Sequence, residues 1–60
     1  MSYTGKVTIK AWTVDAEGEP KHWFATITPD FSNPTDVAAA LIFIDEQLTQ
    51  GHYIEIFPEA

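Results

Sequence analysis

The amino-acid sequence predicts a single α+β domain in which one helix packs on one face of a three-stranded antiparallel sheet. The chain has 60 residues, of which 45% are apolar, enough for one small hydrophobic core. Three segments alternate apolar and polar residues with the period of a β-strand. Between the second and third of them, residues 37–48 carry apolar side chains at helical spacing. The predicted order is therefore strand, strand, helix, strand.

The first predicted strand covers residues 5–14 and leads into a hairpin connection. Its apolar residues alternate with polar ones: Val7, Ile9 and Ala11. The following segment places Gly18 and Pro20 among charged residues, which is typical of a solvent-exposed turn. We expect the chain to reverse direction there.

The second and third predicted strands are also bounded by prolines. Residues 22–28 are rich in aromatic and β-branched side chains and stop at Pro29, which has no backbone N–H to donate. Residues 52–57 alternate again and stop at Pro58. Each segment has the length of an ordinary strand.

The predicted helix has recognisable signals at both ends. Asn33 fits the N-cap position and Pro34 the first helical position, with Thr35 as an alternative cap. The helix should run to about Gln50, where Gly51 can adopt the left-handed conformation that often ends helices.

The connections determine the relative directions of the predicted strands. A helical crossover makes the second and third strands parallel to each other, and the hairpin makes the first strand antiparallel to the second. The simplest sheet places the first strand in the middle, in the order second, first, third. The alternative pairs the third strand beside the second.

One face of this sheet is expected to pack against the helix. The sheet residues expected there are Val7, Ile9, Ala11, Ala25, Ile27, Ile54 and Ile56. The helix residues expected to face them are Val37, Leu41, Ile44 and Leu48. Phe43 lies almost opposite Leu41 on the helix. It either folds over the edge of a thin core or, with Ile42, is buried in a homodimer or another partner.

The opposite sheet face has no second helix to cover it. Trp12, Phe24, Tyr53 and Phe57 are expected there, among Lys10, Thr26 and Glu55. Cross-strand aromatic pairs can stabilise a sheet by themselves. A contiguous apolar patch with a polar rim is also typical of a protein-binding surface. RNA-binding sheets expose aromatic residues as well, but they need positive charge that this chain lacks.

Nine carboxylates against three lysines give a net charge of −6. This charge disfavours direct contact with nucleic acid and anionic membranes and favours basic protein surfaces. Five carboxylates are expected at one end of the domain, which we call the acidic pole: Asp15, Glu17, Glu19, Asp45 and Glu46. The last two lie near the helix C-terminus, where the helix dipole disfavours a negative charge by up to about 1 kcal/mol. The acidic pole either serves solubility or meets a basic groove that ordinarily binds nucleic acid.

The sequence predicts no catalytic chemistry, metal site or cofactor. It has no cysteine and two histidines, with no phosphate-binding glycine loop and no nucleophile with an evident base. Its longest apolar run, residues 37–44, is far shorter than the roughly 20 residues that span a bilayer, and no signal peptide precedes it. We expect a soluble, non-enzymatic protein, and the lack of cysteine is compatible with a reducing cytoplasm.

The segment WFATITPDFSNPTDVAAALIFIDEQL, with its strand-then-helix layout, and the acidic charge give the chain a family resemblance. It resembles small phage-encoded inhibitors of bacterial host machinery: anti-CRISPR proteins that mimic DNA, and short RNA polymerase inhibitors with a helix on a three-stranded sheet. The resemblance implies a surface-binding protein in the cytoplasm of a bacterial host that blocks a nucleic-acid-handling complex, foremost a CRISPR effector. The alternative is an assembly module, either a homodimer or a phage-particle subunit, that uses the aromatic sheet face.

Overall fold

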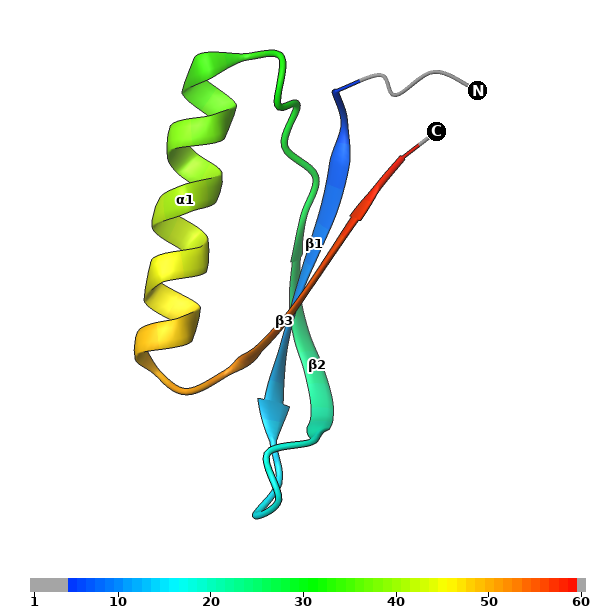
Figure 1. Ribbon diagram of the computed structural model, residues 1–60, viewed down its shortest axis with the longest axis vertical. Helices are drawn as coiled ribbons and strands as arrows, with labels where there is room; N and C mark the ends of the chain where they lie inside the picture. The colour runs from blue at the N-terminus through cyan, green and yellow to red at the C-terminus, as the bar shows by residue number, and fades with distance from the viewer. Residues whose placement is uncertain (1–4, 60) are drawn as a thin grey trace.

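The computed structural model describes residues 5–59 and has the predicted architecture (Figure 1). Its elements are β1 (Val7–Val14), β2 (Pro20–Ile27), α1 (Pro34–Thr49) and β3 (Tyr53–Pro58). The strands form one antiparallel sheet in the order β2-β1-β3, and α1 lies on one face of it. The predicted fold class and strand order are confirmed.

The strand boundaries differ from the predicted ones by one or two residues. β1 begins two residues later than predicted, and β2 begins two residues earlier, at Pro20. β3 includes Pro58, which was expected to end it. The Glu59 N–H donates to the carbonyl of Lys6, the residue before β1. Because successive backbone nitrogens of a strand point to opposite sides, the nitrogen of Pro58 points away from β1. A proline is tolerated there because no ladder hydrogen bond is lost.

Both ends of α1 are capped as predicted. The Asn33 side chain accepts a hydrogen bond from the Thr35 N–H at 2.9 Å, so Asn33 rather than Thr35 is the N-cap. At the other end Gly51 has φ +79°, and its N–H donates to the Leu48 carbonyl. The His52 N–H donates to the Gln47 carbonyl at 3.0 Å, which completes a Schellman motif.

The core is small and centres on β1. The buried apolar residues among those described are Val7, Ile9, Ala11 and Ala40. Ile27, Phe43, Ile44 and Ile54 are partly buried and pack against this cluster. Ile9 is the largest fully buried side chain, so the helix and sheet meet over little apolar volume.

The predicted helix stripe was wrong in its orientation. Ala40 faces the sheet with no exposed surface, whereas Leu41 and Leu48 are each 58% exposed. The small Ala40 side chain lets α1 sit directly over β1, and Phe43 and Ile44 then fill the space on either side. Phe43 therefore packs against the edge of the core, which is the first of the two alternatives that the sequence left open.

The edge of the core on β3 is also more open than predicted. Ile56 was expected to face the helix, and its cross-strand partner is the buried Ile9. The Ile56 side chain is nevertheless 53% exposed, because β3 is an edge strand with a free outer side.

A tight loop closes the domain at the start of β1. The Phe31 N–H donates to the Gly5 carbonyl at 2.6 Å, and Gly5 is buried with φ +93°. A Cβ atom at this position would lie 2.9 Å from Asp30 Oδ1 and 3.2 Å from the Ser32 Cβ. Both the backbone conformation and the space therefore require glycine.

The substitution Gly5→Ala is expected to destabilise the fold by about 2–4 kcal/mol, since it adds steric overlap to left-handed strain. Gly51→Ala is the matched control: φ there is +79°, but no atom lies within 4 Å of the added Cβ. The control should lose only about 1–2 kcal/mol. Urea unfolding of both variants measures the difference, and equal losses would show that the close approach to Asp30 costs nothing.

Asp30 gives this loop a pH dependence. Its Oδ1 accepts hydrogen bonds from the Ser32 hydroxyl at 2.6 Å and the Ser32 N–H at 2.9 Å. These bonds, with a smaller contribution from Lys6, hold the pKa of Asp30 below its ordinary value. A lowered pKa contributes stability above the unfolded-state pKa, and this stability is lost as the pH falls through the folded-state pKa.

Ser32→Ala is expected to raise the pKa of Asp30 toward the ordinary value, because the hydroxyl donor is lost and the backbone donor remains. An NMR titration of the Asp30 carboxyl group measures this shift. The stability difference between wild type and variant should narrow in acid, where Asp30 is protonated in both. An unchanged titration curve would show that the Ser32 hydroxyl does not lower the pKa of Asp30.

Candidate functional site

The hairpin between β1 and β2 forms a rigid acidic turn, which we call the acidic hairpin (residues 15–19). The Asp15 N–H donates to the Glu19 carbonyl and the Gly18 N–H to the Asp15 carbonyl, each at 3.0 Å. The Asp15 carboxylate also accepts hydrogen bonds from the backbone N–H groups of Glu17 at 2.9 Å and Glu19 at 3.0 Å. Asp15 therefore organises the turn, while the side chains of Glu17 and Glu19 are exposed.

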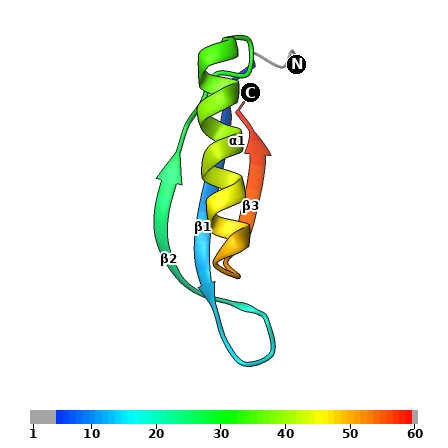
Figure 2. The same cartoon turned by 90° about the vertical axis from the view of Figure 1, so that its left-hand side faces the viewer.

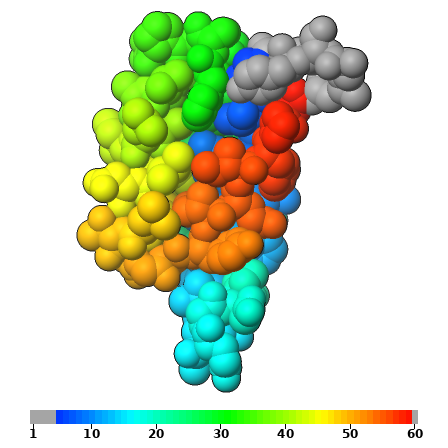
Figure 3. Space-filling model, viewed as in Figure 1, coloured from blue at the N-terminus to red at the C-terminus, as the bar shows by residue number. Residues whose placement is uncertain are grey.

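The acidic hairpin projects beyond the rest of the domain. Figures 1 and 3 show it as a narrow extension past the end of α1. Asp45 and Glu46 are exposed one turn before the C-terminus of α1, on the body of the domain. The predicted acidic pole is thus two groups facing the same end, a hairpin tip and a helix end. Sequence reasoning did not foresee that β1 and β2 extend past the helix.

The sheet face opposite α1, which we call the open face, carries an aromatic row across all three strands. Trp12 of β1 is paired with Trp23 of β2 and with Tyr53 of β3. Trp23 is 57% and Tyr53 38% exposed. The prediction had placed Phe24 in this row and had missed Trp23.

A β-bulge explains the error. The register of β1 and β2 shifts between Ala11 and Trp12, so the alternation of β2 breaks at Phe24. The Phe24 ring instead lies edge-on against the His52 ring, with centroids 4.9 Å apart. His52 Nδ1 lies 2.7 Å from Gln47 Oε1 of α1, which places this ring pair on the helix side of the sheet.

Lys10, Trp12 and Trp23 make polar contacts on the open face within the chain. Lys10 Nζ lies 5.7 Å from the Trp23 ring centroid and 5.5 Å from that of Phe57, which is 40% exposed. The Trp12 indole N–H donates to Glu55 Oε1 at 2.9 Å, and that of Trp23 donates to the Thr26 hydroxyl and the Ala25 carbonyl. These contacts give the aromatic residues a structural role in the sheet.

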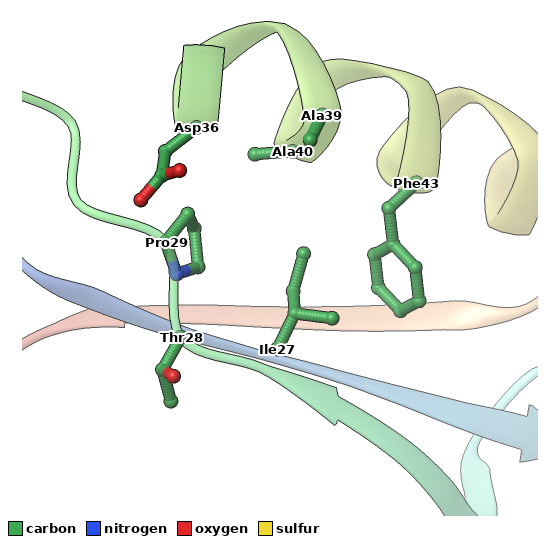
Figure 4. A pocket seen from close by; sticks show the side chains of 7 residues that line it. All are labelled: Ile27, Thr28, Pro29, Asp36, Ala39, Ala40 and Phe43. Atoms are coloured by element: carbon green, nitrogen blue, oxygen red, sulfur yellow. The ribbon is translucent and has the colours of Figure 1, made fainter. Parts of the chain in front are cut away.

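An open pocket of about 300 Å³ lies between the first half of α1 and the end of β2. Figure 4 shows Ile27 and Phe43 side by side beneath the helix, with Thr28 directed away from it. The lining residues are Ile27, Thr28, Pro29, Asp36, Ala39, Ala40 and Phe43. Asp36 already accepts a hydrogen bond from the Asp30 N–H at 3.0 Å. The pocket is mainly apolar and offers no convergent set of polar groups.

The described residues hold no cluster of three or more His, Asp or Glu side chains suited to a metal ion. Within residues 5–59 no helix is long and apolar enough to cross a bilayer. Comparison with protein-family models, with curated proteins and with solved structures finds no significant match to this chain. Arguments about function therefore rest on the chain's own surfaces.

Lys10→Met is expected to lower the free energy of unfolding by about 1 kcal/mol, because methionine keeps the apolar stem but removes the cation from between two rings. Lys21→Met, at an exposed position next to the acidic hairpin, is the matched control and should change stability by less than about 0.5 kcal/mol. Urea unfolding followed by tryptophan fluorescence measures both. Equal effects would mean that the ring contacts of Lys10 do not stabilise the sheet.

Proposed function

We propose that this protein is a non-enzymatic inhibitor that inserts its acidic hairpin into the basic, nucleic-acid-binding groove of a bacterial partner, foremost a CRISPR effector complex. The carboxylates would stand where phosphates of the nucleic acid bind. The target would be blocked by occupancy, and no reaction would take place.

The observation that carries this proposal is the projection of the acidic hairpin past the body of the domain (Figure 3). A narrow acidic extension can enter a groove that would exclude a broad surface. Hydrogen bonds from and to Asp15 hold the turn in one conformation, so little conformational entropy is lost on docking. The net charge of −6 supports fast, salt-sensitive association with a basic partner.

The exposed carboxylates of α1 extend the same argument. Asp45 and Glu46 are exposed near the C-terminus of α1, and within the described residues their carboxylates accept no hydrogen bond that would offset the unfavourable interaction with the negative end of the helix dipole. Basic residues around the groove of the partner would attract these two carboxylates and offset their unfavourable interaction with the helix dipole.

A pull-down from bacterial lysate with competing duplex DNA tests the proposal. The wild-type chain should recover a nucleic-acid-binding complex that duplex DNA displaces and that high salt releases. Glu17→Gln combined with Glu19→Gln should reduce the recovery roughly tenfold, because two contact charges are lost while Asp15 still holds the turn.

The control is Glu55→Gln combined with Glu59→Gln, which changes the net charge equally. Both glutamines retain an acceptor oxygen for the Trp12 indole N–H and the Thr8 hydroxyl. This variant should recover the complex nearly as well as the wild type. Equal losses in the two double variants, or a complex that DNA does not displace, would rule out a docking role for the acidic hairpin.

A further inference from the structure

The aromatic row on the open face contains one indole ring that is both fixed and accessible. The Trp23 indole N–H donates to the Ala25 carbonyl at 3.1 Å and to the Thr26 hydroxyl at 2.6 Å, so the ring is held along its own strand. Its side chain is nevertheless exposed, and Figures 1 and 2 show α1 only on the other side of the sheet. A ring that is already fixed loses little conformational entropy when it binds a ligand.

The open face already binds a cation of its own chain. Lys10 Nζ lies 5.7 Å from the Trp23 ring centroid and 5.5 Å from the Phe57 ring centroid. A cation within about 6 Å of a ring centroid is attracted by the negative face of the ring, and tryptophan attracts it most strongly. Lys10 uses only part of the Trp23 ring, because more than half of this side chain is still accessible to solvent.

Carboxylates outnumber lysines around the aromatic row. The acidic hairpin begins three residues after Trp12, about 10 Å along the strand. It carries three carboxylates, and Glu55 adds a fourth where it accepts the Trp12 indole N–H. The lysines near the row are Lys10 and Lys21. The excess negative charge attracts a positively charged ligand to these rings and repels phosphate groups.

We infer that the aromatic row binds an arginine side chain of the basic partner, with the guanidinium group stacked on Trp23. This inference rests on the proposed function and specifies the chemistry of the partner beside the acidic hairpin. A guanidinium group is planar and weakly hydrated and stacks on aromatic rings, whereas the lysine ammonium group is compact and strongly hydrated. Arginine side chains of nucleic-acid-binding proteins stack on bases in the same way. The aromatic row thus replaces bases where the acidic hairpin replaces phosphates.

Trp23 is the ring of the open face that is best placed for this contact. Trp12 is half-buried, and Tyr53 is less exposed than Trp23. Phe57 also contacts Lys10, but its cross-strand partner is Thr8. Thr8 precedes Trp12 by four residues, so Phe57 lies about 13 Å farther from the acidic hairpin. A partner held by the hairpin reaches Trp23 before it reaches Phe57.

Calorimetric titration with octa-arginine and octa-lysine tests the inference. The two peptides carry equal charge, so the acidic hairpin attracts both. The wild type should bind octa-arginine more tightly than octa-lysine. Trp23→Leu should lower the ratio of the two affinities about threefold, because the stacking surface is lost while every carboxylate remains.

Phe57→Leu is the matched control, since it also removes one ring that contacts Lys10 but leaves Trp23 in place. It should keep the affinity ratio of the wild type. Glu17→Gln combined with Glu19→Gln should weaken both peptides by similar factors, because it removes charge and no ring. An unchanged ratio in Trp23→Leu, or an equal change in Trp23→Leu and Phe57→Leu, overturns the inference.

NMR of the wild-type chain gives a second measurement, which does not depend on the folding of a variant. At equal saturation, the side-chain signals of Trp23 should shift more with octa-arginine than with octa-lysine, and more than those of Phe57. Trp23 signals that respond equally to both peptides overturn the inference. So do Trp23 signals that shift with the concentration of the chain alone, because a second copy would then occupy the row.

The outcomes separate this inference from the proposed inhibition. If the arginine preference depends on Trp23 but the lysate yields no nucleic-acid-binding complex, the row binds arginine and the proposed inhibition is wrong. If the wild type recovers the complex, Trp23→Leu recovers it equally well and the peptide ratio is unchanged, the inhibition stands and the arginine site is wrong.

Discussion

The contact between Ala40 of α1 and the central strand β1 determines the rest of this structure. Both Ala40 and Ile9 are completely buried, and the other core side chains are arranged around them. A methyl group at the contact point allows the helix axis to come close to the sheet, so the larger side chains must lie to its sides. Phe43 fills the side toward β2, and the leucines on the other side remain in contact with solvent. The exposure of Leu41 and Leu48 follows from the choice of alanine as the contact residue.

The elements and their order were predictable because their signals are local. Alternation identifies strands, and Asn33, Pro34 and Gly51 mark the helix ends through hydrogen bonds and backbone conformations within a few residues. The strand directions followed from the hairpin and the helical crossover, and the simplest strand order that satisfies them is the one observed. In contrast, the rotation of α1 about its axis depends on volume complementarity with a distant strand. Eight apolar residues in a row allow several orientations of the helix, and the sequence pattern favoured the one that buries leucines.

The candidate surfaces were predicted only in part for the same reason. The carboxylates of the hairpin and of α1 face one end of the domain as expected, because this depends on topology alone. The prediction named the wrong β2 residue in the aromatic row. The register shift between Ala11 and Trp12 places Trp23, and not Phe24, beside Trp12 on the open face. Nothing in the alternation of the sequence marks that shift. Asp15 had been assigned to partner binding, and the structure gives its carboxylate a second role as the acceptor that orders the turn.

The antiparallel pairing of β1 with β3 brings the two ends of the described chain together. Val7 and Pro58 are cross-strand partners, and both lie at the end of the domain away from the acidic hairpin (Figure 1). A fluorophore, a surface anchor or a fused domain attached at either terminus would therefore be carried on the same side, and the hairpin would point away from it. The domain is suited to immobilisation or fusion with its acidic end left accessible, whichever terminus is used.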